Sequence, residues 1–73
     1  MFSRKVEHNF TVEQLKGIIR ELTRQLGVLE QEGNNKEIRA KMLDISHYNS
    51  MLIPMISWQE YVAFDEELSN IRG

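Results

Sequence analysis

The sequence predicts an all-α domain, in which an antiparallel helical hairpin is followed by a third helix near the C-terminus. A helix-start signal occurs three times, because Thr11, Asn34 and Ser57 each stand three residues before Gln or Glu. In such a signal the first side chain accepts a hydrogen bond from a free backbone N–H, and the Gln or Glu reaches back to do the same. Apolar residues then recur at spacings of three and four after each signal, which is typical of amphipathic helices.

The size of the chain indicates how such a domain must be stabilised. It has 73 residues, of which 41% are hydrophobic and 27% charged, as in ordinary folded proteins. A domain this small buries only roughly 60% of its unfolded surface, and the chain has no cysteine to form a disulfide. We therefore expect either very regular helix packing or pairing with a second copy. The lack of a signal peptide or a long apolar segment predicts a cytoplasmic protein that does not contact membranes.

Residues 1–10 are expected to form a short extended arm. Phe2, Val6 and Phe10 would lie on one face of a strand, because apolar and polar residues alternate there. Such a strand needs an edge to pair with, in a twin chain or in another protein. In a simpler interpretation, the arm is flexible and Phe10 packs on the first helix.

The first helix is predicted over residues 12–32. Its apolar residues form a heptad seam of the kind that pairs helices, and we take five of them as a candidate dimer seam: Leu15, Ile19, Leu22, Leu26 and Leu29. Gly27 would permit an earlier end, but Leu29 continues the seam beyond it. We therefore expect Gly33 to supply the left-handed residue that ends this helix.

The second helix is predicted over residues 35–53, antiparallel to the first because the connection is short. Its apolar stripe comprises Ile38, Met42, Ile45, Asn49 and Leu52. Asn49 is polar, and one polar residue on such a stripe often fixes register or oligomeric state. Pro54 must end the helix by Ile53. Two hairpins would pair as a homodimeric four-helix bundle with the third helix packed outside.

The third helix is predicted over residues 58–71, with the apolar stripe Trp58, Tyr61, Phe64, Leu68 and Ile71. We favour the interpretation that this stripe closes the core across the hairpin. In the alternative, Trp58 and Tyr61 stay exposed and anchor a partner protein, since aromatic residues dominate interface energetics. Both are therefore kept as candidate partner-binding residues.

A positive stripe is predicted on the first helix, where Lys16, Arg20 and Arg24 recur every four residues. One interpretation is a solvated face supported by Glu13–Lys16 and Glu21–Arg24 pairs. The functional interpretation is an electrostatic contact with phosphates or with an acidic protein surface.

No residue set has the spacing of a catalytic or ligand-binding motif. The chain lacks a cysteine nucleophile and a glycine-rich phosphate loop. Adjacent acidic residues at 65–67 would fan outward on a helix. The nearest approach to an acid–base group is Asp44 with His47 and Tyr48, for which a surface hydrogen bond is the simpler explanation. We expect no enzymatic activity, no metal and no cofactor.

Residues 40–46 resemble the turn of repressor-type helix-turn-helix proteins, in which Ala, two variable residues, Leu, Gly, an aliphatic residue and Ser recur. Ala40, Leu43, Ile45 and Ser46 match that pattern. The resemblance implies a dimeric DNA-binding regulator, and places these side chains near DNA bases: Ser46, His47, Asn49 and Ser50.

The favoured function is a small cytoplasmic protein-binding regulator or adaptor that presents helix faces to another protein and forms a homodimer. The absence of catalytic motifs, together with extensive helical surface, supports this expectation. The helix-turn-helix regulator is the alternative, although a net charge of −2 argues against indiscriminate binding to nucleic acid. A structural helical component of a larger assembly is the second alternative.

Overall fold

A computed structural model describes residues 10–73 and confirms the all-α class, since this part of the chain contains helices and no strand. The elements are α1 (Val12–Glu32), α2 (Asn35–Leu52), a 3₁₀ turn η2 (Ile53–Met55) and α3 (Trp58–Arg72). Each of the three α-helices differs from its expected range by at most one residue. The expected strand in residues 1–10 lies outside the described residues apart from Phe10. No helix in residues 10–73 combines the length and hydrophobicity needed to cross a membrane.

Side-chain caps begin all three helices, as predicted, but only two of the three caps show the predicted reciprocal bond. The Thr11 hydroxyl accepts a 3.1 Å bond from the Gln14 N–H, and the Gln14 side chain accepts a 2.9 Å bond from the Thr11 N–H. Ser57 and Glu60 form the same reciprocal pair, with two bonds of 3.1 Å. The Asn34 side chain caps α2 by accepting a 3.3 Å backbone bond. These bonds satisfy N–H groups that the first helical turn leaves without partners.

Gly33 ends α1, and the helix continues through Gly27. Gly33 has a φ of 74° in the left-handed region, where a side chain would be strained. Its N–H donates to the carbonyl oxygens of Leu29 and Glu30. The Leu29 carbonyl also accepts a hydrogen bond from the N–H of Asn34. This closing pattern confirms the expected end, and only one residue then separates Gly33 from α2.

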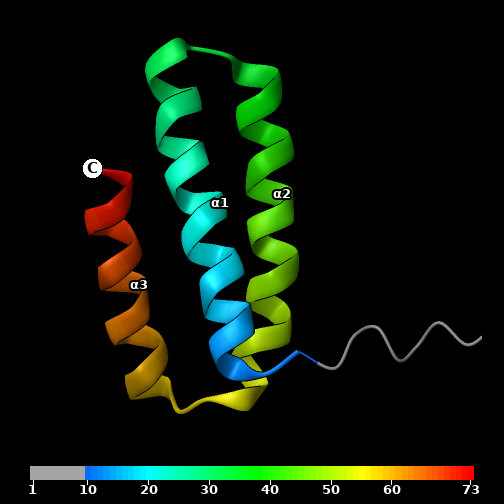
Figure 1. Cartoon of the computed structure of the whole chain (residues 1–73), viewed down its shortest axis with the longest axis vertical. Helices are drawn as coiled ribbons and strands as arrows, with labels where there is room; N and C mark the ends of the chain where they lie inside the picture. Colours follow the sequence, from blue (N-terminus) through cyan, green and yellow to red (C-terminus); the bar gives the residue numbers. More distant parts are fainter. Residues whose placement is uncertain (1–9) are drawn as a thin grey trace, which may run out of the picture.

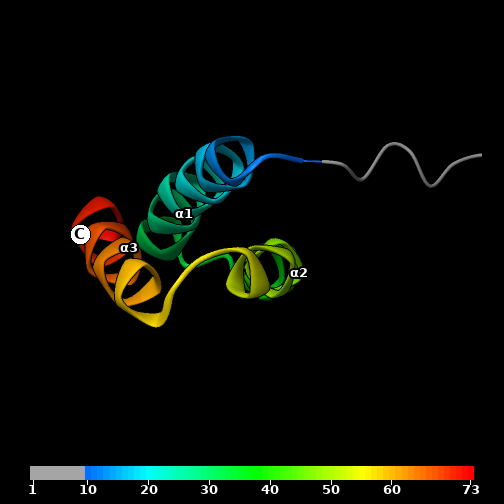
Figure 2. The ribbon, with the colours of Figure 1, turned by 90° about the horizontal axis from the view of Figure 1, so that it is seen from below.

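Helix α1 is the central element of the fold. Figure 1 shows α2 running antiparallel on one side of α1 and α3 running parallel to α1 on the other, and Figure 2 shows the same arrangement from below. Both α2 and α3 pack mainly on α1, while their contact with each other is slight. The third helix therefore does not close the bundle, and the space between α2 and α3 stays open on one side.

The core is thin and centred on α1. Its buried cluster comprises Leu15, Ile19, Leu52, Phe64 and Leu68, and Leu26 is buried as well. Phe10 packs against this cluster and meets the ring of Tyr48 edge-on, with ring centroids 6.3 Å apart. The N-terminal end of α1 is thereby held against α2.

The core interpretation of the third apolar stripe is correct for Phe64 and Leu68 but wrong for Trp58. Trp58 is 72% exposed and stacks on Tyr61, with ring centroids 5.8 Å apart. The reason is that α3 has only α1 as a close neighbour, so part of its stripe remains uncovered. Phe64 and Leu68 face α1, whereas Trp58 extends from the first turn of α3 into solvent.

Candidate functional site

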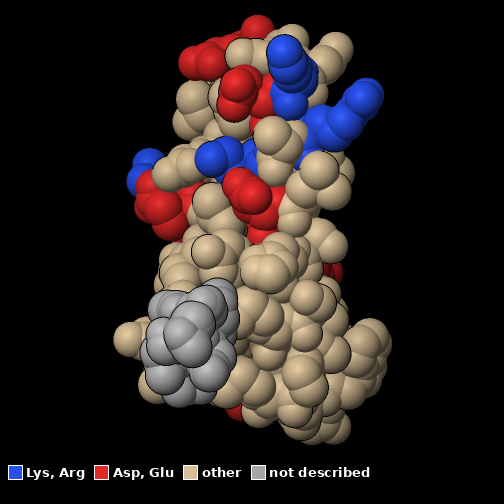
Figure 3. Space-filling model, turned by 90° about the vertical axis from the view of Figure 1, so that its right-hand side faces the viewer, with Lys and Arg blue, Asp and Glu red and all other residues tan. Residues whose placement is uncertain are grey.

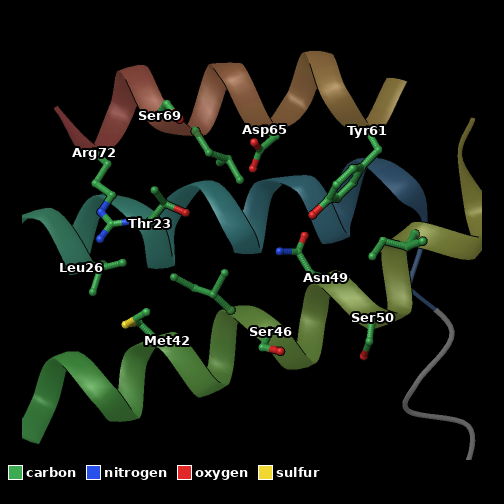
Figure 4. A pocket seen from close by; sticks show the side chains of 13 residues that line it. Thr23, Leu26, Met42, Ser46, Asn49, Ser50, Tyr61, Asp65, Ser69 and Arg72 are labelled. Atoms are coloured by element: carbon green, nitrogen blue, oxygen red, sulfur yellow. The ribbon is translucent and has the colours of Figure 1, made fainter. Parts of the chain in front are cut away.

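A pocket of about 420 Å³ lies between α2 and α3, with Thr23 and Leu26 of α1 among its lining residues. Figure 4 shows side chains of α2 and α3 entering this space from opposite sides, with α1 behind it. We call it the α2–α3 groove. Its walls include Met42, Asn49 and Ile53 from α2 and the adjoining turn, and Tyr61, Asp65 and Arg72 from α3.

The groove has the length and residue spacing of a helix-binding surface. The lining residues on the α2 side include positions 42, 45, 49 and 53, and those on α3 include positions 61, 65, 68 and 72. Each set recurs every three or four residues over three turns, which is about 16 Å of helix. The α2 wall therefore presents mainly apolar side chains at helical spacing, whereas the α3 wall alternates Tyr61 and Leu68 with the charged Asp65 and Arg72.

Apolar side chains on the α2 wall remain open to solvent. Met42 is 49% exposed and Ile53 is 47% exposed. The sequence also contains no Asp, Glu, Lys or Arg over residues 45–59. Figure 3 shows the α2 side of the molecule, where charged side chains gather toward the α1–α2 connection and the other end is mostly uncharged. The C-terminal part of α2 and the turn that follows it are therefore poorly suited to remain fully in water.

Asn49 contributes a buried polar atom to the groove. Its side-chain oxygen Oδ1 has no hydrogen-bond partner among the described residues. Thr23 differs, since its hydroxyl donates a 2.7 Å bond to the carbonyl of Ile19. A buried acceptor left without a donor costs free energy, so native proteins rarely retain one. Among the described residues, Asn49 is thus the one lining residue with a buried side-chain atom that lacks a hydrogen-bond partner.

Charges at the groove are unequally compensated. The Arg72 guanidinium pairs with Glu30 through two hydrogen bonds, one of them 3.0 Å from Nε to Oε1. This contact raises the pKa of Arg72 and holds the pKa of Glu30 below its usual value. Asp65 forms no ion pair within residues 10–73, and its carboxylate is directed into the groove in Figure 4. The groove consequently has one negative charge without a counter-charge from this part of the chain.

The positive stripe on α1 contributes to packing within the chain. Arg20 pairs with Glu67 of α3, with its Nε 2.5 Å from Oε2, and this hydrogen bond lowers the pKa of Glu67. Lys16 and Arg20 also lie over the ring of Phe64, 5.6 Å and 5.4 Å from its centroid. Arg24 forms the predicted pair with its neighbour Glu21, at 2.5 Å. Arg20 and Arg24 are therefore neutralised by ion pairs. Lys16 and Arg20 help to hold α3 on α1.

The candidate dimer seam is largely covered by the chain itself. Leu15, Ile19 and Leu26 are at most 3% exposed, because α2 and α3 pack over them. Leu22 and Leu29 are partly exposed. A heptad pattern indicates that a helix face is buried but not which chain buries it, and here the covering helices belong to the same molecule. Leu15, Ile19 and Leu26 are therefore not free to pack against a second copy.

The turn implied by the helix-turn-helix resemblance is absent, because residues 40–46 lie inside the continuous helix α2. Asp44 stands where the pattern has glycine, and neither glycine nor proline interrupts residues 35–52. Ser46, His47 and Ser50 are exposed on α2, and the His47 ring meets the Tyr48 ring edge-on. The candidate DNA-binding residues therefore do not begin a separate recognition helix.

No protein-family model matches the chain, and no curated protein or solved structure matches it. Within residues 10–73, no cluster of three or more His, Asp or Glu residues is placed to hold a metal ion. Sequence reasoning singled out Asn49 and Tyr61, which the structure brings to one groove. It left open whether residues 51–56, which include Ile53, form buried core or a docking patch, and the structure places Ile53 at the groove. It expected Asp65 to fan outward with its acidic neighbours, whereas Asp65 lines the groove from the apolar side of α3.

Proposed function

We propose that this chain is a small, non-enzymatic regulator or adaptor of the cytoplasm that binds an amphipathic helix of another protein in the α2–α3 groove. In this proposal the α1–α2 hairpin and α3 provide three positions of a four-helix bundle, and the partner supplies the fourth. The observation that carries it is the helical spacing of the lining residues on both walls of one open groove.

Exposed side chains around the groove support this proposal. Met42 and Ile53 would lose water contact under a bound helix, which favours binding in proportion to the apolar area covered. Trp58 stacks on Tyr61, and Tyr61 lines the groove. Large aromatic side chains beside a groove are typical anchors for a helical partner.

The test is a selection of helices from a displayed library. The library would hold peptides of about five turns, long enough to cover three turns of each wall, with every position of one face randomised. The full chain is the bait, and the affinities of selected peptides are then measured for two variants. Met42→Asp places a charge in the groove, and Leu43→Asp places the same charge at a more exposed neighbouring position that does not line it.

Selected helices should lose about tenfold or more in affinity for Met42→Asp and retain their affinity for Leu43→Asp. Failure to select any helix would overturn the proposal, and so would equal effects of the two variants. Light scattering over a wide concentration range measures the mass of the free chain, and this mass tells whether a second copy binds instead of another protein. Self-association abolished by Met42→Asp alone would make the groove a homodimer interface and would exclude an adaptor for another protein.

A further inference from the structure

We infer that the helix bound in the α2–α3 groove carries one cationic side chain, Arg or Lys, in the middle of its apolar face. This inference rests on the proposed function and specifies the chemistry of the partner. It follows from two oxygen acceptors that residues 10–73 leave without donors or counter-charge.

The first acceptor is Asn49 Oδ1, which is buried and has no hydrogen-bond donor within the described residues. An apolar helix laid over the groove would seal this atom further from water without satisfying it. Burial of a polar group is costly unless a hydrogen bond compensates it. A partner that binds here therefore needs a donor at the height of Asn49.

The second acceptor is the carboxylate of Asp65, which lines the groove from the opposite wall. Figure 4 shows Asn49 and Asp65 extending into the same space from α2 and α3, with the Tyr61 hydroxyl also directed there. A bound helix would remove the carboxylate from water, and a buried charge without a partner is strongly unfavourable. The compensating group must be both a donor and a cation.

The other charges near the groove do not meet this need. Arg72 is held by Glu30 through two hydrogen bonds and also lines the groove nearer its other end. An ammonium group offers three donors and a guanidinium five, so either has enough donors for both the amide oxygen and the carboxylate. Arg is favoured where the two acceptors lie apart, because its planar donors diverge.

The same library selection tests this inference when all amino acids are allowed at the randomised face. Binding helices should contain a single Arg or Lys near the centre of that face. Their affinity should fall about tenfold or more for Asp65→Asn, because the cation then lacks its counter-charge. Glu66→Gln is the matched control, since it removes one carboxylate from the same helix at an exposed position that does not line the groove.

A second measurement uses one selected peptide with its central Arg replaced by citrulline, which is uncharged and similar in shape. Asp65→Asn should weaken the Arg peptide much more than the citrulline peptide. Helices that bind the groove through apolar or acidic residues alone would overturn this inference and leave the proposed function intact. Equal effects of Asp65→Asn and Glu66→Gln would also overturn it, whereas failure to select any helix would remove both proposals.

Discussion

Gly27 of α1 lies against the carbonyl oxygen of Arg72, so closely that a β-carbon on Gly27 would stand 3.1 Å from that oxygen. The last turn of α3 therefore rests directly on the backbone of α1. The pairing of Arg72 with Glu30 lies at the same end of the α1–α3 contact. Glycine weakens an isolated helix, but at position 27 it allows α1 and α3 to approach closely.

Gly17→Ala and Gly27→Ala should differ in their effect on stability. Replacement of a mid-helix glycine by alanine is worth about 1 kcal/mol in helix propensity. A β-carbon on Gly17 would meet no neighbouring group of the described residues within 4 Å, so Gly17→Ala should raise the free energy of unfolding by that amount. Gly27→Ala should gain clearly less, because the end of α3 must shift. Urea unfolding of both variants measures the difference, and equal gains would show that α3 does not rest on Gly27.

Asn49→Leu should stabilise the free chain and weaken the binding of helices that carry a central cation. Removal of the unsatisfied buried oxygen should raise the free energy of unfolding by about 1 kcal/mol. Thermal unfolding gives the first effect, and peptide titration gives the second. A loss of stability would mean that Asn49 has a donor in the free protein, which contradicts the inferred role of its oxygen.

Stability should fall as the pH drops below about 4.5. The pKa of Glu67 is lowered from 4.5 by its hydrogen bond to Arg20, and that of Glu30 by Arg72. As the pH falls, these carboxylates therefore take up protons at a higher pH in the unfolded chain than in the folded chain. Their ion pairs stabilise the fold fully only above the pKa that the carboxylates have in the unfolded chain. Urea unfolding followed from about pH 7 to about pH 3 measures the decline. Glu67→Gln should make it shallower, whereas a steep decline unchanged by Glu67→Gln would assign the acid sensitivity to other groups.

Trp58 and Phe64 should contribute very differently to stability, although both belong to the apolar stripe of α3. Trp58→Ala should change the free energy of unfolding by no more than about 0.5 kcal/mol, because that side chain is 72% exposed. Phe64→Ala should cost about 3–5 kcal/mol, since Phe64 is 3% exposed in the core. Circular dichroism during thermal unfolding compares them, and Phe64→Leu provides a milder variant if the alanine variant does not fold. A large loss for Trp58→Ala would mean that its ring is covered in solution.

Local interactions explain why the helix ends were predictable. The caps at Thr11 and Ser57 join residues three positions apart, and Gly33 closes α1 through bonds within one turn. Such interactions depend on sequence neighbours alone, so the residue types suffice to recognise them. The all-α class follows from the same signals.

Which element covers each apolar helix face depends on tertiary packing, and the sequence predicted this only in part. The heptad positions Leu15 and Ile19 are buried as their pattern requires, but by helices of their own chain. Trp58 belongs to an apolar stripe that α1 covers only in part. The groove itself joins residues from α2 and α3, whose relation is fixed only once both helices pack on α1.

Because α2 and α3 scarcely touch, the distance between the groove walls is determined by the side chains through which each packs on α1. Substitutions at the α1–α3 contact, at Gly27 or Phe64 for example, would tilt one wall without changing a residue that lines the groove. If the groove binds helices as we propose, selectivity for thicker or thinner partner helices would then depend on positions that no partner touches, while the acceptors Asn49 and Asp65 keep their chemistry.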